Sequence, residues 1–138
     1  DKIPASEILS AINGIIGDRP INLHWMVAAD AVPKPAAKVL LNLALIVNDA
    51  LVRGGELSIG FEQQDDGMVE IVLHCEADRI LLDKEIEAIL AEGEGAGETS
   101  SRTITAVLVQ ALAVQHGGQV MLAREAANSL IIGAVLRP

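Results

Sequence analysis

The sequence predicts an α/β fold of the α+β type, in which helices pack on a β-sheet within one domain. Some stretches of the chain have apolar residues at the spacing of one helical face, and others have apolar and polar residues in turn, as in strands. Along the chain these stretches follow the order αβαββααββ. Of the 138 residues, 51% are apolar but only 1% are aromatic, so Leu, Ile, Val and Ala must build the core. A chain of this length and composition can bury a substantial core in a single domain.

The first third of the chain predicts two helices with a strand between them. Residues 4–16 carry isoleucines at the spacing of one helical face, and Gly17 is placed to end that helix. Residues 21–27 alternate like a strand, and two prolines then separate this strand from the next element. Residues 36–51 would place apolar side chains around almost the whole circumference of a helix, which is typical of a helix that is buried on more than one side.

The rest of the chain predicts two hairpins with two helices between them. The Asp-Gly turn of residues 64–67 joins the strands of the first hairpin. The glycine- and glutamate-rich residues 92–98 separate the two helices, and we expect them to be mobile. The predicted elements are strands at residues 56–63 and 68–77, a helix at residues 81–91, a helix that Ser100 or Ser101 caps and that ends at Gly117 and Gly118, and strands at residues 119–124 and 129–136.

Charge and cysteine content argue against several classes of protein. Ten basic and nineteen acidic residues give a net charge of -9, which would repel nucleic acid, and Asp83, Glu85 and Glu87 are typical of a solvated helix face. The lone Cys75 lies in an alternating apolar stretch, so we expect a buried thiol in a reducing cytoplasm. We expect neither membrane association nor export, because no apolar run approaches ~18 residues and the N-terminus lacks a signal-peptide pattern.

Two segments of the sequence resemble the ATP-binding domain of sensor histidine kinases. One is the Asn-Leu pair at Asn42 on the predicted buried helix, and the other is the His-Gly-Gly-Gln-Val join that starts at His116. The resemblance extends from about Ile21 to the end of the chain, and the C-terminal part is its most specific portion. It implies a two-layer sandwich, with helices on one face of a mixed β-sheet, similar to the histidine-kinase ATP-binding (Bergerat or GHKL) fold.

The chain departs from those kinases at the positions that bind nucleotide. The kinase asparagine that ligates magnesium corresponds to Ile46, and isoleucine has no oxygen donor for the metal. The kinase aspartate that receives the adenine amino group corresponds to Asp78, which here lacks the glycines that follow it in kinases. Gly97 ends a run of glycines flanked by glutamates, whose carboxylates would repel a triphosphate. The resemblance therefore implies a vestigial nucleotide pocket around Asn42, Ile46, Asp78 and Gly97, with no ATP, other cofactor or metal bound.

A narrower resemblance covers residues 40–45 and 50–55, which read LLNLAL and ALVRGG. These segments closely resemble alphaproteobacterial histidine phosphotransferases of the ChpT type. In that family, an N-terminal helical hairpin dimerises and carries a phosphorylatable histidine, and a degenerate kinase-like domain follows it. The resemblance assigns residues 18–138 to this second domain, and residues 1–17 to a helix that is either the end of the hairpin or a linker.

The same resemblance implies partners and a role. The parent protein would form a homodimer through the hairpin and relay a phosphoryl group from the receiver domain of a hybrid kinase to response regulators. The present domain would dock response-regulator receiver domains, and Leu41 and Leu45 lie off the main apolar stripe of their helix as candidate docking residues. The alternative for these leucines is cover by the helix at residues 4–16. Two other functions remain open, namely a divergent kinase-like domain that still binds ATP and a protein-interaction adaptor outside any phosphorelay.

No catalytic residue is assigned within this chain. It contains no helical His-Asp or His-Glu pair of the phosphoacceptor kind, so we expect phosphoryl transfer to need a histidine outside it. His24, His74 and His116 lie beside predicted strands or a helix end and share no metal-ligand spacing, which favours structural roles. We therefore expect neither kinase nor ATPase activity from the chain alone.

Overall fold

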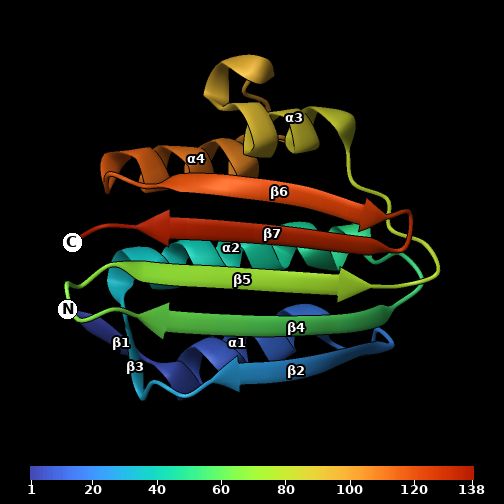
Figure 1. Ribbon diagram of the computed structural model, residues 1–138. Helices are drawn as coiled ribbons and strands as arrows, with labels where there is room; N and C mark the ends of the chain where they lie inside the picture. The colour runs from blue at the N-terminus through green and yellow to red at the C-terminus, as the bar shows by residue number, and fades with distance from the viewer.

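A mixed five-stranded sheet forms one layer of the structure and helices form the other (Figure 1). The computed structural model describes residues 1–138, except for the side chain of Glu94. The strand order is β2-β4-β5-β7-β6, with β2 parallel to β4 and the other neighbouring pairs antiparallel. This confirms the predicted α/β sandwich with a mixed sheet. The strands are β2 (Ile21–Val27), β4 (Gly55–Gln63), β5 (Val69–Glu76), β6 (Gln119–Ala126) and β7 (Ser129–Leu136).

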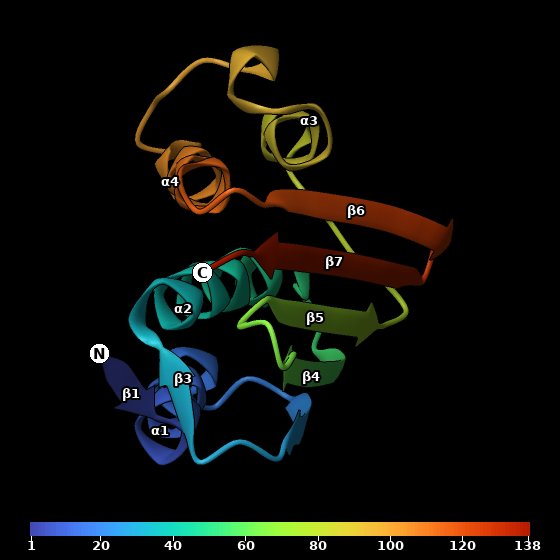
Figure 2. The ribbon, with the colours of Figure 1, turned by 60° about the vertical axis from the view of Figure 1, so that its left-hand side comes forward.

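Three helices cover one face of the sheet, and a fourth lies at its β6 edge (Figure 2). Helix α2 packs against both α1 and α4, so it occupies the centre of the helical layer. No helix within the described residues has the length and apolar content to cross a membrane. The helices are α1 (Ala5–Ile16), α2 (Lys34–Ala50), α3 (Lys84–Glu92) and α4 (Ile104–Gln115), with the short 3₁₀ helix η1 (Glu94–Ala96) between α3 and α4.

Helix α2 is buried deeply, as its sequence predicts. Leu40, Leu43 and Val47 are fully buried and pack into one core with strand residues such as Leu57 and Leu73. Branched aliphatic side chains from the two layers fill this core. The core therefore forms with few of the aromatic residues that fill the centre of many domains of this size.

The first helix belongs to the same core. Ile8 and Ile12 are fully buried, and α1 packs against α2. The preceding strand β1 (Lys2–Pro4) pairs antiparallel with β3 (Ala31–Pro33), which leads directly into α2. Residues 1–17 are thus held to α2 both by side-chain packing and by backbone pairing.

The short elements β1, β3 and η1 are absent from the sequence-based prediction. The two strands have three residues each, too few for a visible alternation, and both end in a proline. The 3₁₀ helix lies within the glycine-rich residues 92–98. Such short elements carry little periodic signal, and tertiary contacts decide whether they form.

The two later helices begin slightly after their predicted starts, and a side chain caps the first of them. Helix α3 begins at Lys84, and the Asp83 carboxylate accepts hydrogen bonds from two backbone N–H groups of its first turn, at 2.9 and 3.1 Å. Helix α4 begins at Ile104, and its N-cap residue is Thr103, so the prediction that Ser100 or Ser101 caps this helix is wrong. The Ser100 hydroxyl accepts a hydrogen bond from the Thr103 N–H at 3.3 Å, just before this helix.

Candidate functional site

A cavity of about 400 Å³ lies between the C-terminal half of α2, the segment that precedes α3, and the start of α4. The Leu81 N–H donates a hydrogen bond to the Ala50 carbonyl at 2.9 Å, which holds the segment before α3 against the end of α2. The lining residues are Leu45, Ile46, Asp49, Ala50, Leu81, Leu82, Asp83, Ile86, Ser101, Arg102 and Thr105.

The structure places one of the predicted nucleotide-pocket residues in the cavity wall. Ile46 lines the cavity and is 4% exposed. Asn42 lies one turn earlier on α2, and its side-chain amide donates a hydrogen bond to the Lys38 carbonyl at 2.7 Å. Asp78 is exposed, and neither it nor Gly97 lines the cavity. The cavity therefore presents a hydrocarbon side chain at Ile46, where the resemblance to kinases implies a magnesium ligand.

Arg102 is the one basic residue among the described residues that line the cavity, and two carboxylates already pair with it. Its Nε lies 2.9 Å from Asp83 Oδ2, and its guanidinium also donates a hydrogen bond to Glu85. Asp49 adds a further carboxylate to the lining. A triphosphate that entered would meet an arginine whose charge is already neutralised by carboxylates, together with the carboxylate of Asp49. Such an environment is electrostatically unfavourable for a phosphate group.

The acidic residues around α3 have specific partners rather than only solvent. Asp83 caps the helix, and Glu85 pairs with Arg102. Glu87 Oε1 lies 3.2 Å from an Arg124 guanidinium nitrogen on β6. An aspartate directly before an amphipathic stretch is a recognisable cap signal, so the sequence alone could have indicated the capping role of Asp83. The arginine pairings join residues far apart in the chain and leave no local signal.

Two of the histidines occupy separate hydrogen-bonded positions on the sheet. His24 Nε2 lies 2.7 Å from Glu56 Oε1. The hydrogen bond from His24, with a second from Asn22, lowers the pKa of the Glu56 carboxyl. His74 Nε2 lies 3.1 Å from Ser129 Oγ on the neighbouring strand. Neither histidine lines the cavity beside α2.

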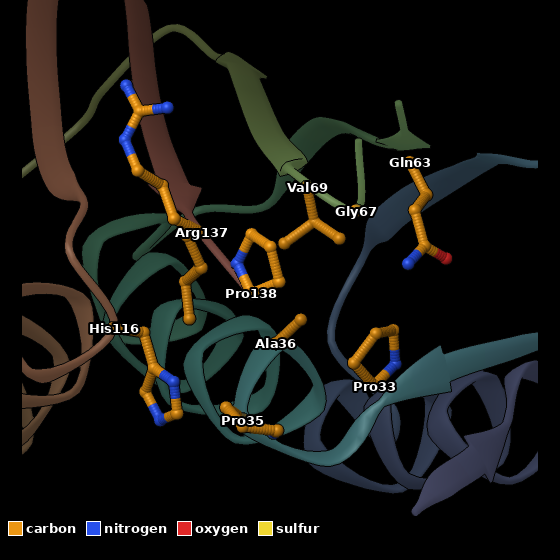
Figure 3. A pocket seen from close by; sticks show the side chains of 10 residues that line it. Pro33, Pro35, Ala36, Gln63, Gly67, Val69, His116, Arg137 and Pro138 are labelled. Carbon is orange, nitrogen blue, oxygen red and sulfur yellow. The ribbon is translucent and has the colours of Figure 1, made fainter. Parts of the chain in front are cut away.

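The third histidine lies at the edge of a second cavity, of about 290 Å³ (Figure 3). This cavity lies near the N-terminal end of α2, and Ala36, Val69 and Pro138 contribute to its mostly apolar lining. The His116 carbonyl accepts a hydrogen bond from the Arg137 N–H at 2.8 Å, which ties the end of α4 to the end of β7. The two cavities share no lining residue.

Cys75 lies in the core, as the sequence predicts. It is 1% exposed, and burial raises the pKa of its thiol to about 12. A thiol that stays protonated at neutral pH is a poor nucleophile. Within the described part of the chain, no group of three or more His, Cys, Asp or Glu side chains is placed to hold a metal ion.

The histidine phosphotransferase C-terminal domain family matches residues 5–128 of the sequence. The chain belongs to this family. The matched range begins with α1 and runs past β6, so the family includes the first helix as well as the elements around the cavity. This membership confirms the resemblance to histidine phosphotransferases. No curated protein sequence matches the chain.

Solved structures share the fold of this histidine phosphotransferase domain. A bacterial phosphotransferase matches 96% of the chain with a TM-score of 0.80 and 20% identity, and the chain spans 64% of that protein. The mycobacterial sensor histidine kinase MprB matches 99% of the chain with a TM-score of 0.69 and 16% identity, over 97% of its own length. The catalytic domain of histidine kinase ThkA, in a nucleotide-free form, matches 99% with a TM-score of 0.69 and 13% identity, over 95% of its length. These matches confirm the predicted histidine-kinase ATP-binding fold.

We predict that Asp83→Ala lowers the free energy of unfolding by about 1–2 kcal/mol, because α3 loses its N-cap and Arg102 loses a carboxylate partner. Asp83→Ser should recover most of this loss, since a serine hydroxyl caps a helix without pairing with arginine. Arg102→Gln should cost less than Asp83→Ala, because its ion pairs are partly exposed. Urea denaturation followed by circular dichroism measures all three variants. Equal losses for the alanine and serine variants would show that the cap contributes little.

Proposed function

We propose that this domain docks receiver domains of response regulators within a histidine phosphotransferase, and that it does so without ATP. The observation that carries the proposal is an exposed apolar surface on α2 and α4, beside a cavity whose walls do not suit nucleotide. This surface, which we call the α2–α4 face, consists of Leu41, Leu45, Ile104 and Leu108.

The α2–α4 face gathers large apolar side chains on two adjacent helices. Leu45, Ile104 and Leu108 are 41%, 48% and 44% exposed, and Leu41 is half-buried one turn from Leu45. Thr105 lines the same cavity as Leu45, so this side of α2 adjoins the first turn of α4. Single exposed leucines are common, but a group of them on neighbouring elements is typical of a protein-interaction site.

The first helix leaves this face available. Helix α1 packs on α2 and buries Ile8 and Ile12 in the shared core, yet Leu45 stays exposed. Leu41 is covered in part. This arrangement supports docking over the alternative, in which the chain's own first helix covers both leucines.

The chemistry of the cavity supports function without nucleotide. Ile46 presents a hydrocarbon side chain where the kinase resemblance implies a magnesium ligand, and magnesium needs oxygen donors. Arg102 is already paired with Asp83 and Glu85. A triphosphate that entered would lose hydration without gaining a metal ion or an uncompensated positive charge.

The wider proposal concerns the parent protein. We infer a helical hairpin that precedes this domain, dimerises and carries the phosphoacceptor histidine, with residues 1–17, which pack on α2, connecting the hairpin to the rest of the domain. Family membership supports this, as does the greater length of the bacterial phosphotransferase, of which the chain spans 64%. The histidine would accept a phosphoryl group from the receiver domain of a hybrid kinase and pass it to response regulators in the cytoplasm.

We predict that the chain shows no magnesium-dependent binding of ATP or ADP in the micromolar range. The reason is the apolar wall at Ile46 together with the carboxylates that surround Arg102. Isothermal titration calorimetry with magnesium present measures this, and a sensor histidine kinase domain serves as the positive control. Micromolar binding that disappears when magnesium is chelated would favour a divergent kinase-like domain instead.

We predict that Leu45→Glu in the parent protein weakens binding to its response regulator by about tenfold or more, because the new carboxylate would be desolvated in an apolar contact. The fold should persist, since Leu45 is 41% exposed. Affinity is measured by calorimetry, and a thermal unfolding curve checks the fold.

The matched control is Met121→Glu, an equivalent change at a half-exposed position of β6 on the helix-free face of the sheet. It should leave the affinity unchanged. If Leu45→Glu stays folded and keeps its affinity and transfer rate, the α2–α4 face takes no part in docking.

A further inference from the structure

The face of the sheet that carries no helices has an apolar strip across all five strands. Met26, Gly60, Val72, Gly133 and Met121 are direct neighbours in the register of β2, β4, β5, β7 and β6. Met26, Val72 and Met121 are 64%, 40% and 50% exposed. Figure 1 shows this face in front of α1 and α2, which lie behind the strands.

A shallow cavity of about 430 Å³ opens at one end of this strip, over Gly60. A Cβ atom built on Gly60 would meet nothing within 4 Å, so the missing side chain leaves open space between Met26 and Val72. The lining residues are Met26, Ala28, Gly60, Phe61, Glu62, Glu70 and Val72.

Two carboxylates line the cavity beside its apolar floor. Glu62 and Glu70 lie directly opposite each other on β4 and β5, both are exposed, and neither forms an ion pair with a described basic side chain. Like charges at directly opposite positions of a sheet destabilise it. A second opposed pair, Glu56 and Glu76, differs because Glu56 is hydrogen-bonded to His24. The Glu62 and Glu70 pair therefore places uncompensated negative charge beside the cavity.

We propose that this surface binds a basic segment of a partner protein, with an arginine or lysine side chain laid across Gly60 and its charged group between Glu62 and Glu70. Long basic side chains combine an apolar stem with a cationic head, which matches an apolar floor with two carboxylates beside it. The exposed methionine can adapt to different neighbours. Nucleic acids and anionic membranes carry the wrong sign of charge for this surface. It lies on the opposite face of the sheet from α2 and α4, so the inference is independent of the docking proposed above.

The test is a titration of the isotope-labelled chain with a short peptide of alternating arginine and valine, followed by NMR. The backbone amide signals of Met26, Gly60 and Val72 should shift most. Replacing both Glu62 and Glu70 by Gln should weaken binding by about tenfold or more, because charge-assisted hydrogen bonds are lost. The same double variant should unfold at a higher, not lower, temperature, since the opposed charges are removed.

A second variant tests the cavity separately from the charge. Gly60→Val fills the open space, is compatible with the backbone and suits a strand, so the fold should persist while peptide binding weakens. The charge-matched control replaces Glu7 and Asp18, exposed at α1 and just after it, by Gln and Asn and should leave the affinity unchanged. The proposal fails if the largest shifts lie elsewhere, if the control weakens binding as much as the Glu62 and Glu70 variant, or if Gly60→Val binds the peptide as the unaltered chain does.

Discussion

Helix α2 packs against α1, α4 and the sheet, and its burial on these three sides holds the two layers together (Figure 2). Its fully buried residues, among them Leu40, Leu43 and Val47, join the layers into one core. A buried helix of this kind leaves few positions free for other roles. Here, Leu45 and Ile46 both line the cavity, but only Leu45 is also exposed enough to contribute to the α2–α4 face.

The fold of this family member is that of a histidine-kinase catalytic domain, but the side chains in its cavity suggest no kinase chemistry. The structure keeps the architecture of a histidine-kinase catalytic domain, and a cavity remains beside α2. Its wall is apolar at Ile46, and its cation is compensated by Asp83 and Glu85. A shared fold does not imply a shared activity, because activity depends on the side chains that the fold places in the site. The proposed docking role therefore rests on the α2–α4 face and not on a ligand in the cavity.

The sequence predicts the long periodic elements well and the cavity only in part. The all-round apolar pattern of α2 identifies a buried helix, because burial itself selects that pattern. The resemblance to kinases selects Ile46, which lines the cavity, but it cannot show that Asn42 hydrogen-bonds to its own helix or that Gly97 lies outside the lining. The ion pairs of Arg102 could not be predicted from the sequence, because its partners Asp83 and Glu85 become its neighbours only when the chain folds.

Receiver docking on the α2–α4 face is tested most directly by NMR mapping of a receiver domain on the isotope-labelled domain. The cognate response regulator's receiver is titrated in, and changes in the methyl and amide signals of the domain are followed. We predict that the largest changes fall on Leu45, Ile104 and Leu108, with the helix-free face of the sheet unaffected. Largest changes on the strands, or no change at receiver concentrations that support phosphoryl transfer, would contradict it.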